Sequence, residues 1–257
     1  MECIKMAKYF EVTTDNGHIQ IDDTYKNLVS IYKRPKRTTV QEQIVVQNEY
    51  VTKTDTFALM NIDKDTILTA VKPLKLGVPF IVSQVNRKIK IYSDVRKGKG
   101  CEFDVYEYGA KYNGNATGDF GLNIFNVDGD LIYTSACRYL DIVCCFSGKF
   151  QLKQNVSNEK CLNTSAFTPI FHKKKGHKYA SLQGIYPYFF YDYNPQGHHA
   201  GTLGIMETEQ EIGLMPMDLG MTDYIDLEYP EWLSPDSDVW RYVNYTIVDV
   251  TDYDLDS

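Results

Sequence analysis

Apolar and polar residues alternate along much of the chain, which is the pattern of strands that bury one face of a sheet. Short alternating or apolar runs lie at residues 57–60, 66–71, 80–82, 88–92, 103–108 and 240–250. The polar residues 61–65 between the first two runs predict a turn. Long stretches of helical period are missing. Strands at such regular spacing, with turn residues between them, predict an all-β sandwich or barrel.

One part of this pattern occurs twice. Residues 9–31 align without a gap onto residues 121–143, at an offset of 112 residues that places Gly17 opposite Gly129. Each copy is an alternating run, a polar turn that ends in Gly, a second alternating run, a polar break and a third run. That order predicts a strand, a tight turn, a paired strand and a return strand, which together form a small β-meander.

The repeat also predicts the domain organisation of the 257-residue chain. We expect two related units of meander or sandwich type with long loops. Residues 1–108 would form an N-terminal β unit with the first copy. Residues 109–257 would form a C-terminal β unit with the second copy, at residues 119–146, and an aromatic-rich extension. Residues 109–119 are rich in Gly and Asn and lack alternation, which is typical of a linker or exposed loop, with a simple connection between neighbouring strands as the alternative.

The composition fits a folded protein and limits the classes of partner that it can bind. Twenty Tyr and twelve Phe favour strands. The net charge of −7 argues against a general nucleic-acid binder, which needs a cationic surface. The basic runs at residues 33–37 and 173–175 are interpreted as solvated loops, with an electrostatic docking patch as the alternative. The acidic residues after position 218 are interpreted as a solvated tail, with divalent cation binding as the alternative, although the spacing of a calcium loop is absent.

The sequence also bears on the compartment. No apolar segment approaches the roughly 20 residues that cross a bilayer, and the first residues lack the apolar core of a secretory signal. We therefore expect synthesis in a cytoplasm and no membrane insertion, and either Met1 or Met6 as the true start. The six cysteines show neither zinc spacing nor a disulfide rhythm, which predicts reduced thiols in the core.

Motifs that would assign catalytic residues, a cofactor or a metal are absent from the sequence. It contains neither a phosphate-binding Gly-rich loop that ends in Lys-Ser or Lys-Thr nor a Gly-x-Ser-x-Gly elbow. Carboxylate pairs can be chosen freely among 34 acidic residues, so their presence decides nothing. The histidines are interpreted as exposed loop residues, with a metal or ligand site as the alternative: His18, His172, His177, His198 and His199. We predict a protein that is not an enzyme and has no cofactor.

An aromatic-rich stretch at residues 179–193 is the candidate contact surface. Alternate rings along a strand face one side, and exposed Tyr rings suit stacking on sugars or on a flat protein surface. Sheet core with cross-strand aromatic pairs is the alternative. Residues 194–204 are interpreted as a loop, and the Met-rich residues 213–221 as an irregular segment that packs or contacts a partner. The candidate contact residues are Tyr186, Tyr188, Tyr191, Tyr193, His198 and His199.

The second copy of the repeat, DFGLNIFNVDGDLIYTSACRYLDIV at residues 119–143, resembles a motif of tailed-bacteriophage tail proteins. In that family, a sequence of the type Tyr-Gly-Leu-x-Val-x-Asn is followed by Gly, a short strand and an Asp-Ser pair. Residues 7–23 resemble the way family members begin, and residues 105–108 resemble the lead-in to the motif. The resemblance covers residues 6–145. It departs at Thr134, where the family tends to have Asp, and it leaves out the aromatic C-terminal third.

The resemblance implies a structural virion protein of the distal tail or fibre region, made in the host cytoplasm and assembled with other tail proteins. Such parts are repeated around the tail axis, so it also implies association of identical copies. Two other functions stay open. One is a receptor-binding protein that recognises a host-surface glycan or an outer-membrane protein, and the other is a tail-associated polysaccharide hydrolase.

Overall fold

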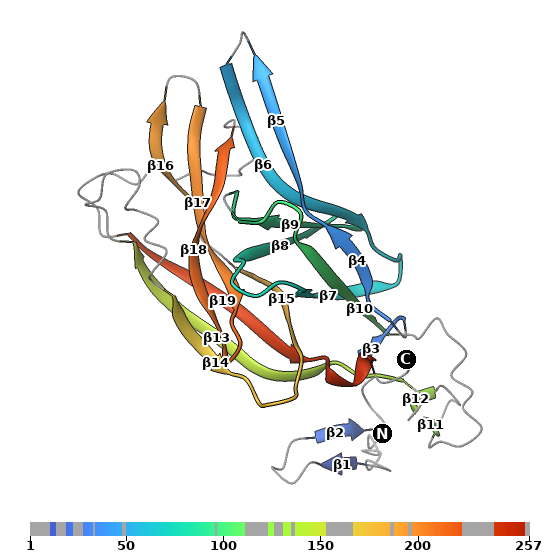
Figure 1. Ribbon diagram of the computed structural model, residues 1–257. Helices are drawn as coiled ribbons and strands as arrows, with labels where there is room; N and C mark the ends of the chain where they lie inside the picture. The colour runs from blue at the N-terminus through green and yellow to red at the C-terminus, as the bar shows by residue number, and fades with distance from the viewer. Residues whose placement is uncertain are drawn as a thin grey trace, which may run out of the picture.

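The computed structural model describes residues 11–13, 19–22, 28–32, 34–47, 50–95, 97–110, 123–125, 131–134, 137–152, 167–185, 188–194, 197–222 and 239–254. Within these ranges the chain forms two large antiparallel sheets and two sheets of two strands each (Figure 1). The same ranges contain no α-helix, and one short 3-10 helix, η2 (Thr251–Asp254), follows the last strand. The prediction of an all-β fold is confirmed.

The two large sheets are called the first sheet and the second sheet. The first sheet has the strand order β13-β19-β15-β7-β10-β3, and β4 also pairs with β10. Its strands are β13 (Asp141–Leu152), β19 (Val239–Asp249), β15 (Tyr179–Ile185), β7 (Thr66–Pro73), β10 (Glu102–Gly109), β3 (Val29–Ser30) and β4 (Lys36–Thr39). The second sheet has the order β14-β18-β17-β8-β9-β6-β5, and β16 also pairs with β17. Its strands are β14 (Thr168–His172), β18 (Glu211–Thr222), β17 (Gly197–Glu207), β8 (Phe80–Val85), β9 (Lys88–Ser93), β6 (Tyr50–Asn61), β5 (Gln41–Gln47) and β16 (Tyr188–Asn194).

The facing sides of the two sheets enclose the main hydrophobic core. Phe103 of β10 and Phe80 of β8 are both buried, and their ring centroids lie 5.1 Å apart in an edge-to-face arrangement. Tyr245 of β19 donates a hydrogen bond from its hydroxyl to the carbonyl oxygen of Leu203 in β17, at 2.7 Å. Because successive strand residues alternate between faces, each strand supplies every second side chain to this core. The architecture is that of a β-sandwich.

Strands from both predicted units take part in the sandwich. In the first sheet, β7 and β10 precede residue 109, β15 and β19 follow it, and β15 pairs with β7. In the second sheet, β17 pairs with β8 where Ile205 lies opposite Phe80. The main core likewise contains side chains from before and after residue 109. The division between residues 108 and 109 stays a prediction, and residues 111–122 lie outside the described ranges.

A second hydrophobic cluster covers the other face of the first sheet. Its buried members are Ala70, Tyr106, Tyr108, Ala180, Leu182, Val248, Val250 and Tyr253. Tyr253 comes from η2, and its ring makes edge-to-face contacts with Tyr106 at 5.1 Å and with Tyr108 at 6.3 Å. Burial raises the pKa of Tyr253 to about 12. The first sheet is therefore buried on both faces here, which explains why the run at residues 103–108 carries large side chains of both parities.

The repeated segment folds into the same hairpin twice. β1 (Glu11–Thr13) pairs with β2 (Ile19–Asp22), and β11 (Asn123–Phe125) pairs with β12 (Leu131–Thr134), so the strand bounds are identical after a shift of 112 residues. Both hairpins begin with corresponding residue pairs, and both have a register shift between their second and third pairs. The predicted strand pairs are confirmed in both copies. The return strand of the predicted β-meander is wrong, because β3 pairs with β10 and β13 pairs with β19, and neither pairs with the hairpin before it. The turns that contain Gly17 and Gly129 lie outside the described residues.

The third run of each copy enters the first sheet, as β3 and as the start of β13, and the two copies meet there. The backbone N–H of Leu140 donates to the carbonyl oxygen of Leu28 at 2.9 Å, and Val29 lies opposite Tyr139 in an antiparallel bridge. Leu28 and Leu140 are the same position of the two copies, so equivalent residues face each other about a local pseudo-twofold axis. The Tyr139 ring stacks on that of Tyr133 in β12 at 4.9 Å. Since β3 and β13 stand at opposite ends of the strand order, this bridge links the two ends of the first sheet.

Candidate functional site

The structure places most of the predicted contact residues in one strand pair. Tyr188, Tyr191 and Tyr193 lie in β16, His198 and His199 lie in β17, and Tyr186 lies outside the described residues. Tyr193 is directly opposite His198 in the register. Tyr191 is the extra residue of a β-bulge, because the pairing moves from Phe190 to Asp192. The contact-surface assignment stays a prediction, since it concerns binding.

The loop predicted at residues 194–204 is wrong. β16 ends at Asn194 and β17 begins at Gly197, so His198 and His199 are successive residues of a strand. β17 pairs with β16 on one edge and with β18 on the other, and these two ladders hold a Gly-rich sequence extended. The irregular segment predicted at residues 213–221 is likewise a strand, part of β18, in which Met215 and Met217 are buried.

The β16–β17 strand pair and the two repeated hairpins lie at opposite ends of the molecule. In Figure 1, β16, β17 and β18 rise beside the β5–β6 hairpin at the top, whereas β1–β2 and β11–β12 lie at the bottom. A partner that binds the aromatic strand pair would therefore be well separated from one that binds the repeat.

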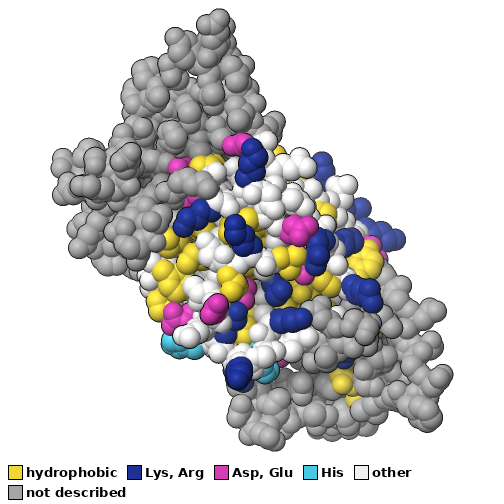
Figure 2. Space-filling model, in the orientation of Figure 1, with side chains coloured by type: hydrophobic (Ala, Val, Ile, Leu, Met, Phe, Trp, Pro, Cys, Tyr) yellow, Lys and Arg dark blue, Asp and Glu magenta, His cyan; other side chains and the backbone are white. Residues whose placement is uncertain are grey.

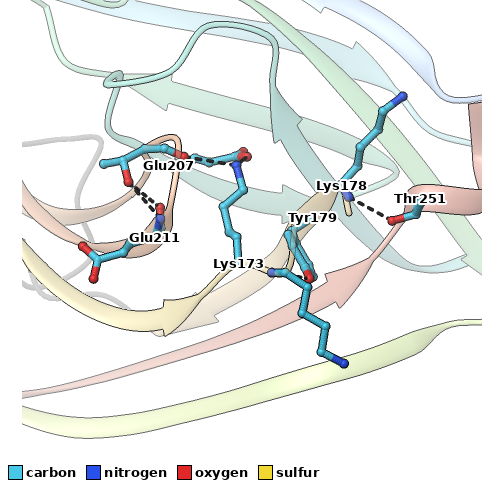
Figure 3. Close-up of polar contacts among 8 residues, drawn as sticks. Lys173, Lys178, Tyr179, Glu207, Glu211 and Thr251 are labelled. Carbon is cyan, nitrogen blue, oxygen red and sulfur yellow. Dashed lines mark hydrogen bonds and ion pairs between the residues drawn. The ribbon is translucent and has the colours of Figure 1, made fainter. Parts of the chain in front are cut away.

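A second candidate is the lysine loop, residues 173–178, which joins β14 to β15. Lys173 lies 2.5 Å from Glu207 through its Nζ and the Oε1 atom, and the same ammonium donates to the carbonyl oxygen of Thr208 at 3.1 Å (Figure 3). The side chains of Lys173 and Glu207 are 13% and 7% exposed, respectively. Lys174 and Lys175 are exposed. The prediction that residues 173–175 form a solvated loop therefore holds for Lys174 and Lys175. It is wrong for Lys173, because the Lys173 ammonium forms an ion pair with the buried carboxylate of Glu207.

The turn between β17 and β18 holds the carboxylate partner of Lys173 in place. The Thr208 hydroxyl accepts a hydrogen bond from the backbone N–H of Glu211 at 2.9 Å and donates to its carbonyl oxygen at 3.0 Å (Figure 3). The backbone N–H of Lys173 donates to the carbonyl oxygen of Gln210 at 2.8 Å. His172 also lies 3.1 Å from Glu211, but its side chain is 82% exposed, so this pair contributes little.

The other end of the lysine loop is fastened to the C-terminal end of β19. His177 Nδ1 lies 2.6 Å from Asp249 Oδ2, and the His177 ring stacks on Tyr179 at 6.1 Å. The Thr251 hydroxyl donates to Asp249 at 2.6 Å and accepts from the backbone N–H of Lys178 at 2.9 Å. Burial alone would raise the pKa of Asp249, but hydrogen bonds from Thr251 and His177 outweigh it and lower that pKa.

The lowered pKa of Asp249 predicts a dependence of stability on pH. A carboxyl group whose native pKa is depressed stabilises the fold above its unfolded pKa, about 3.9, and loses that contribution as pH falls through the native value. We expect Asp249→Asn to be less stable than the wild type at neutral pH, and the difference to shrink below about pH 4. Urea unfolding of both proteins at neutral and acidic pH measures this. Asp65→Asn, at an exposed turn, controls for loss of a charge. An Asp249→Asn deficit of equal size at both pH values would contradict the assignment.

A third polar network surrounds a buried carboxylate in β10. Glu107 is fully buried, and its Oε2 atom accepts hydrogen bonds from the backbone N–H of Asp63 and from the Thr66 hydroxyl, each at 2.6 Å. Its Oε1 atom forms an ion pair with the Lys36 ammonium at 2.5 Å. Tyr32 donates to the Asp63 carboxylate at 2.7 Å, and this hydrogen bond raises the pKa of Tyr32 to about 12. The network fastens the β6–β7 turn to β4 and β10.

The sequence also pointed to the cysteines and to residues that could bind a metal ion. Cys101 and Cys137 are buried, which raises the pKa of both thiols. The core position predicted for Cys145 is wrong, because β13 is an edge strand and Cys145 is exposed while Cys144 packs against the main core. Cys3 and Cys161 lie outside the described residues. Among the described residues, no cluster of three or more His, Cys, Asp or Glu could hold a metal ion.

None of the helices within the described ranges is long and apolar enough to cross a membrane. No family model, no curated protein and no solved structure matches the chain.

The sequence pattern did not reveal the partners of the lysine loop. Lys173 and Glu207 are 34 residues apart, and Asp249 is 72 residues from His177. Only the pairing of β14 with β18 and of β15 with β19 brings these groups together. The basic run was the one local feature of the sequence that pointed to these partners, because a buried lysine among consecutive lysines needs a carboxylate as its counter-charge.

Proposed function

We propose that the protein is a non-enzymatic structural component of a bacteriophage tail, in the distal tail or fibre region. The observation that carries this proposal is the doubled hairpin. The motif at residues 119–143 resembles tail proteins, and it coincides with β11, β12 and the start of β13. The same hairpin recurs as β1 and β2 with the same register, and β3 follows it. This supports the proposal because the motif corresponds to a folded unit that the chain uses twice.

The polar networks also support a structural role. Buried ion pairs hold the lysine loop to the β17–β18 turn and the β6–β7 turn to β4 and β10. Buried charges of this kind are satisfied by each other and by backbone groups, so they rigidify connections. The partners we propose are other tail proteins and identical copies around the tail axis, with the protein located in the tail of the virion.

The proposal is tested on particles of the phage that encodes the chain. Purified particles are separated into heads and tails, and each fraction is probed with an antibody raised against the purified protein. We expect the protein in the tail fraction, at a fixed ratio to the major tail protein. Its absence from particles, or its presence only in the soluble lysate, would overturn the proposal.

A receptor-binding role is a second candidate, favoured by the position of β16. This strand pairs with β17 at the end of the molecule away from the repeated hairpins (Figure 1). Tyr193 and His198 are opposite each other there. Tyrosine rings suit stacking on sugar rings or on a flat protein surface.

The receptor-binding candidate is tested with Tyr188→Ala and Tyr191→Ala. Receptor recognition requires that both variants keep the wild-type melting temperature while the purified protein loses binding to host cells and no longer competes with infection. Insoluble variants would instead assign the rings to the sheet core. Wild-type protein that binds no host surface would exclude the candidate.

A further inference from the structure

The sandwich is closed on one side and open on the other. On the closed side, β4 of the first sheet runs directly into β5 of the second sheet, and the residue between them, Val40, is 2% exposed. On the open side, β13 and β14 are the terminal strands of the two sheets, and Figure 1 shows both at the lower left. The bridge between Val29 and Tyr139 lies before β13 begins. Within the described ranges, β19 is the one strand that pairs with β13 itself.

The main core is incompletely covered on the open side. Cys144 and Phe146 of β13 pack against this core, as do Ile170 and Phe171 of β14, yet all four side chains are only half-buried. Figure 2 shows hydrophobic side chains at the surface on the left of the described face, which is the side where β14 lies in Figure 1. A strand added to the edge of β13 would remove apolar surface from water, which is favourable.

β13 also lacks the residues that protect edge strands. Sheet edges in native proteins usually carry charged residues or Pro. At the other end of the first sheet, β4 carries Lys36 and Arg37, and Figure 2 shows Lys and Arg side chains gathered over that face. β14 carries Pro169. Residues 142–148, with the sequence IVCCFSG, contain neither a charge nor Pro, and the register with β19 is regular over Cys144–Leu152. Such an edge is a template for another strand.

We propose that β13 of one copy pairs in antiparallel orientation with β13 of a second copy. Asp141 and Lys149 are the two charged residues of β13, and they lie toward opposite ends of the strand. Antiparallel pairing brings the Asp141 end of each copy to the Lys149 end of the other, whereas parallel pairing would bring like charges together. The uncharged residues between these ends then lie opposite each other. Ile142 and Val143, which are 51% and 37% exposed, lose contact with water.

The contact is isologous, because the same strand of both copies meets about a twofold axis. It joins the first sheets of two copies into one continuous sheet and gives a closed dimer that does not grow further. Rings of copies form through heterologous contacts between different surfaces. The dimer therefore goes beyond the proposed tail role and leaves other surfaces for assembly around a tail axis.

Charged side chains on the outward face of β13 test the contact in the full-length protein. Cys145 and Ser147 are exposed, so substitutions there leave the core intact. The lysine variant carries Cys145→Lys and Ser147→Lys, and the glutamate variant carries Cys145→Glu and Ser147→Glu. In sedimentation equilibrium under reducing conditions, we expect a wild-type dimer and, for each variant alone, association weakened about tenfold or more, because like charges face each other. An equimolar mixture of the two variants should dimerise again.

The control variant carries Thr168→Lys and His172→Lys, at two exposed positions of β14, and should dimerise like the wild type. Circular dichroism establishes that every variant is folded. A monomeric wild type would overturn the proposal and leave the edge to a strand of another protein. A mixture of folded variants that stays monomeric would also overturn it, as would loss of the dimer in the control variant or growth of the wild type beyond a dimer. Each of these outcomes leaves the tail role to the experiment on particles.

Discussion

Phe103→Ala is expected to lower the free energy of unfolding by about 3–5 kcal/mol. Phe103 is fully buried in β10, and its ring contacts Phe80 of the opposite sheet at 5.1 Å. Truncation removes the transfer free energy of the ring and leaves a cavity between the sheets, which β-strands that are paired on both edges cannot close. Urea unfolding followed by far-ultraviolet circular dichroism measures the change, with the slope against urea expected to stay constant.

The matched control for Phe103→Ala is Leu76→Ala. Leu76 is 43% exposed in the connection after β7, so its truncation should change stability by no more than about 0.5 kcal/mol. Equal effects of the two substitutions would contradict the position of Phe103 at the centre of the core.

The core contains residues from before and after residue 109. We therefore expect tryptophan fluorescence and circular dichroism to report one coincident unfolding transition.

Glu207→Ala is expected to cost a similar amount, about 3–5 kcal/mol. The substitution leaves the Lys173 ammonium, which is 13% exposed, with only the carbonyl oxygen of Thr208 as an acceptor at 3.1 Å. An uncompensated buried charge is far more costly than the absence of the whole pair. Replacing both residues with apolar ones, as Lys173→Met with Glu207→Leu, should therefore restore most of the stability.

A double-mutant cycle over Lys173 and Glu207 measures the coupling between them. His172→Ala serves as the control, since its ion pair with Glu211 is exposed and should contribute no more than about 1 kcal/mol. Additive losses from the two single substitutions would contradict a buried ion pair. If the Lys173 and Glu207 variants unfold only the lysine loop and leave the sandwich folded, that result would also contradict the proposed role of the ion pair in fastening β14 to β17 and β18.

The strands that the sequence predicted are those that form short alternating or apolar runs, whether one face of the strand is buried, as in β9, or both faces are, as in β10. The runs at residues 66–71 and 88–92 lie within β7 and β9, and the polar turn at residues 61–65 overlaps the connection between β6 and β7. The repeat was predictable for the same reason, because alternation and a Gly-containing turn act over a few residues. The strand bounds of its two copies agree throughout both hairpins.

The strands that the sequence missed depend on their neighbours. β17 carries glycines and two histidines where a loop was predicted, and it is extended because β16 and β18 pair with it along both edges. Tertiary pairing overrides the low strand propensity of glycine in such cases. The sequence placed Glu107 within an alternating run. It did not predict the burial of Glu107, because Lys36, Asp63 and Thr66 come together around its carboxylate only in the fold.

The relation between the two copies of the repeat also requires the fold. Alignment pairs Leu28 with Leu140 as equivalent positions, but only the structure brings their backbones within hydrogen-bonding distance, at 2.9 Å. The bridge beside them links the two ends of the first sheet. The third run of each copy is therefore part of the first sheet, whereas the hairpins of the repeat form two separate two-stranded sheets.

The central claim is that the protein occupies the distal part of a phage tail. Gold-labelled antibody raised against the purified chain, imaged by electron microscopy on intact particles, tests it most directly. We expect label at the end of the tail away from the head, on most particles. Label on the head, or particles that carry none while the antibody recognises the purified protein, would contradict it.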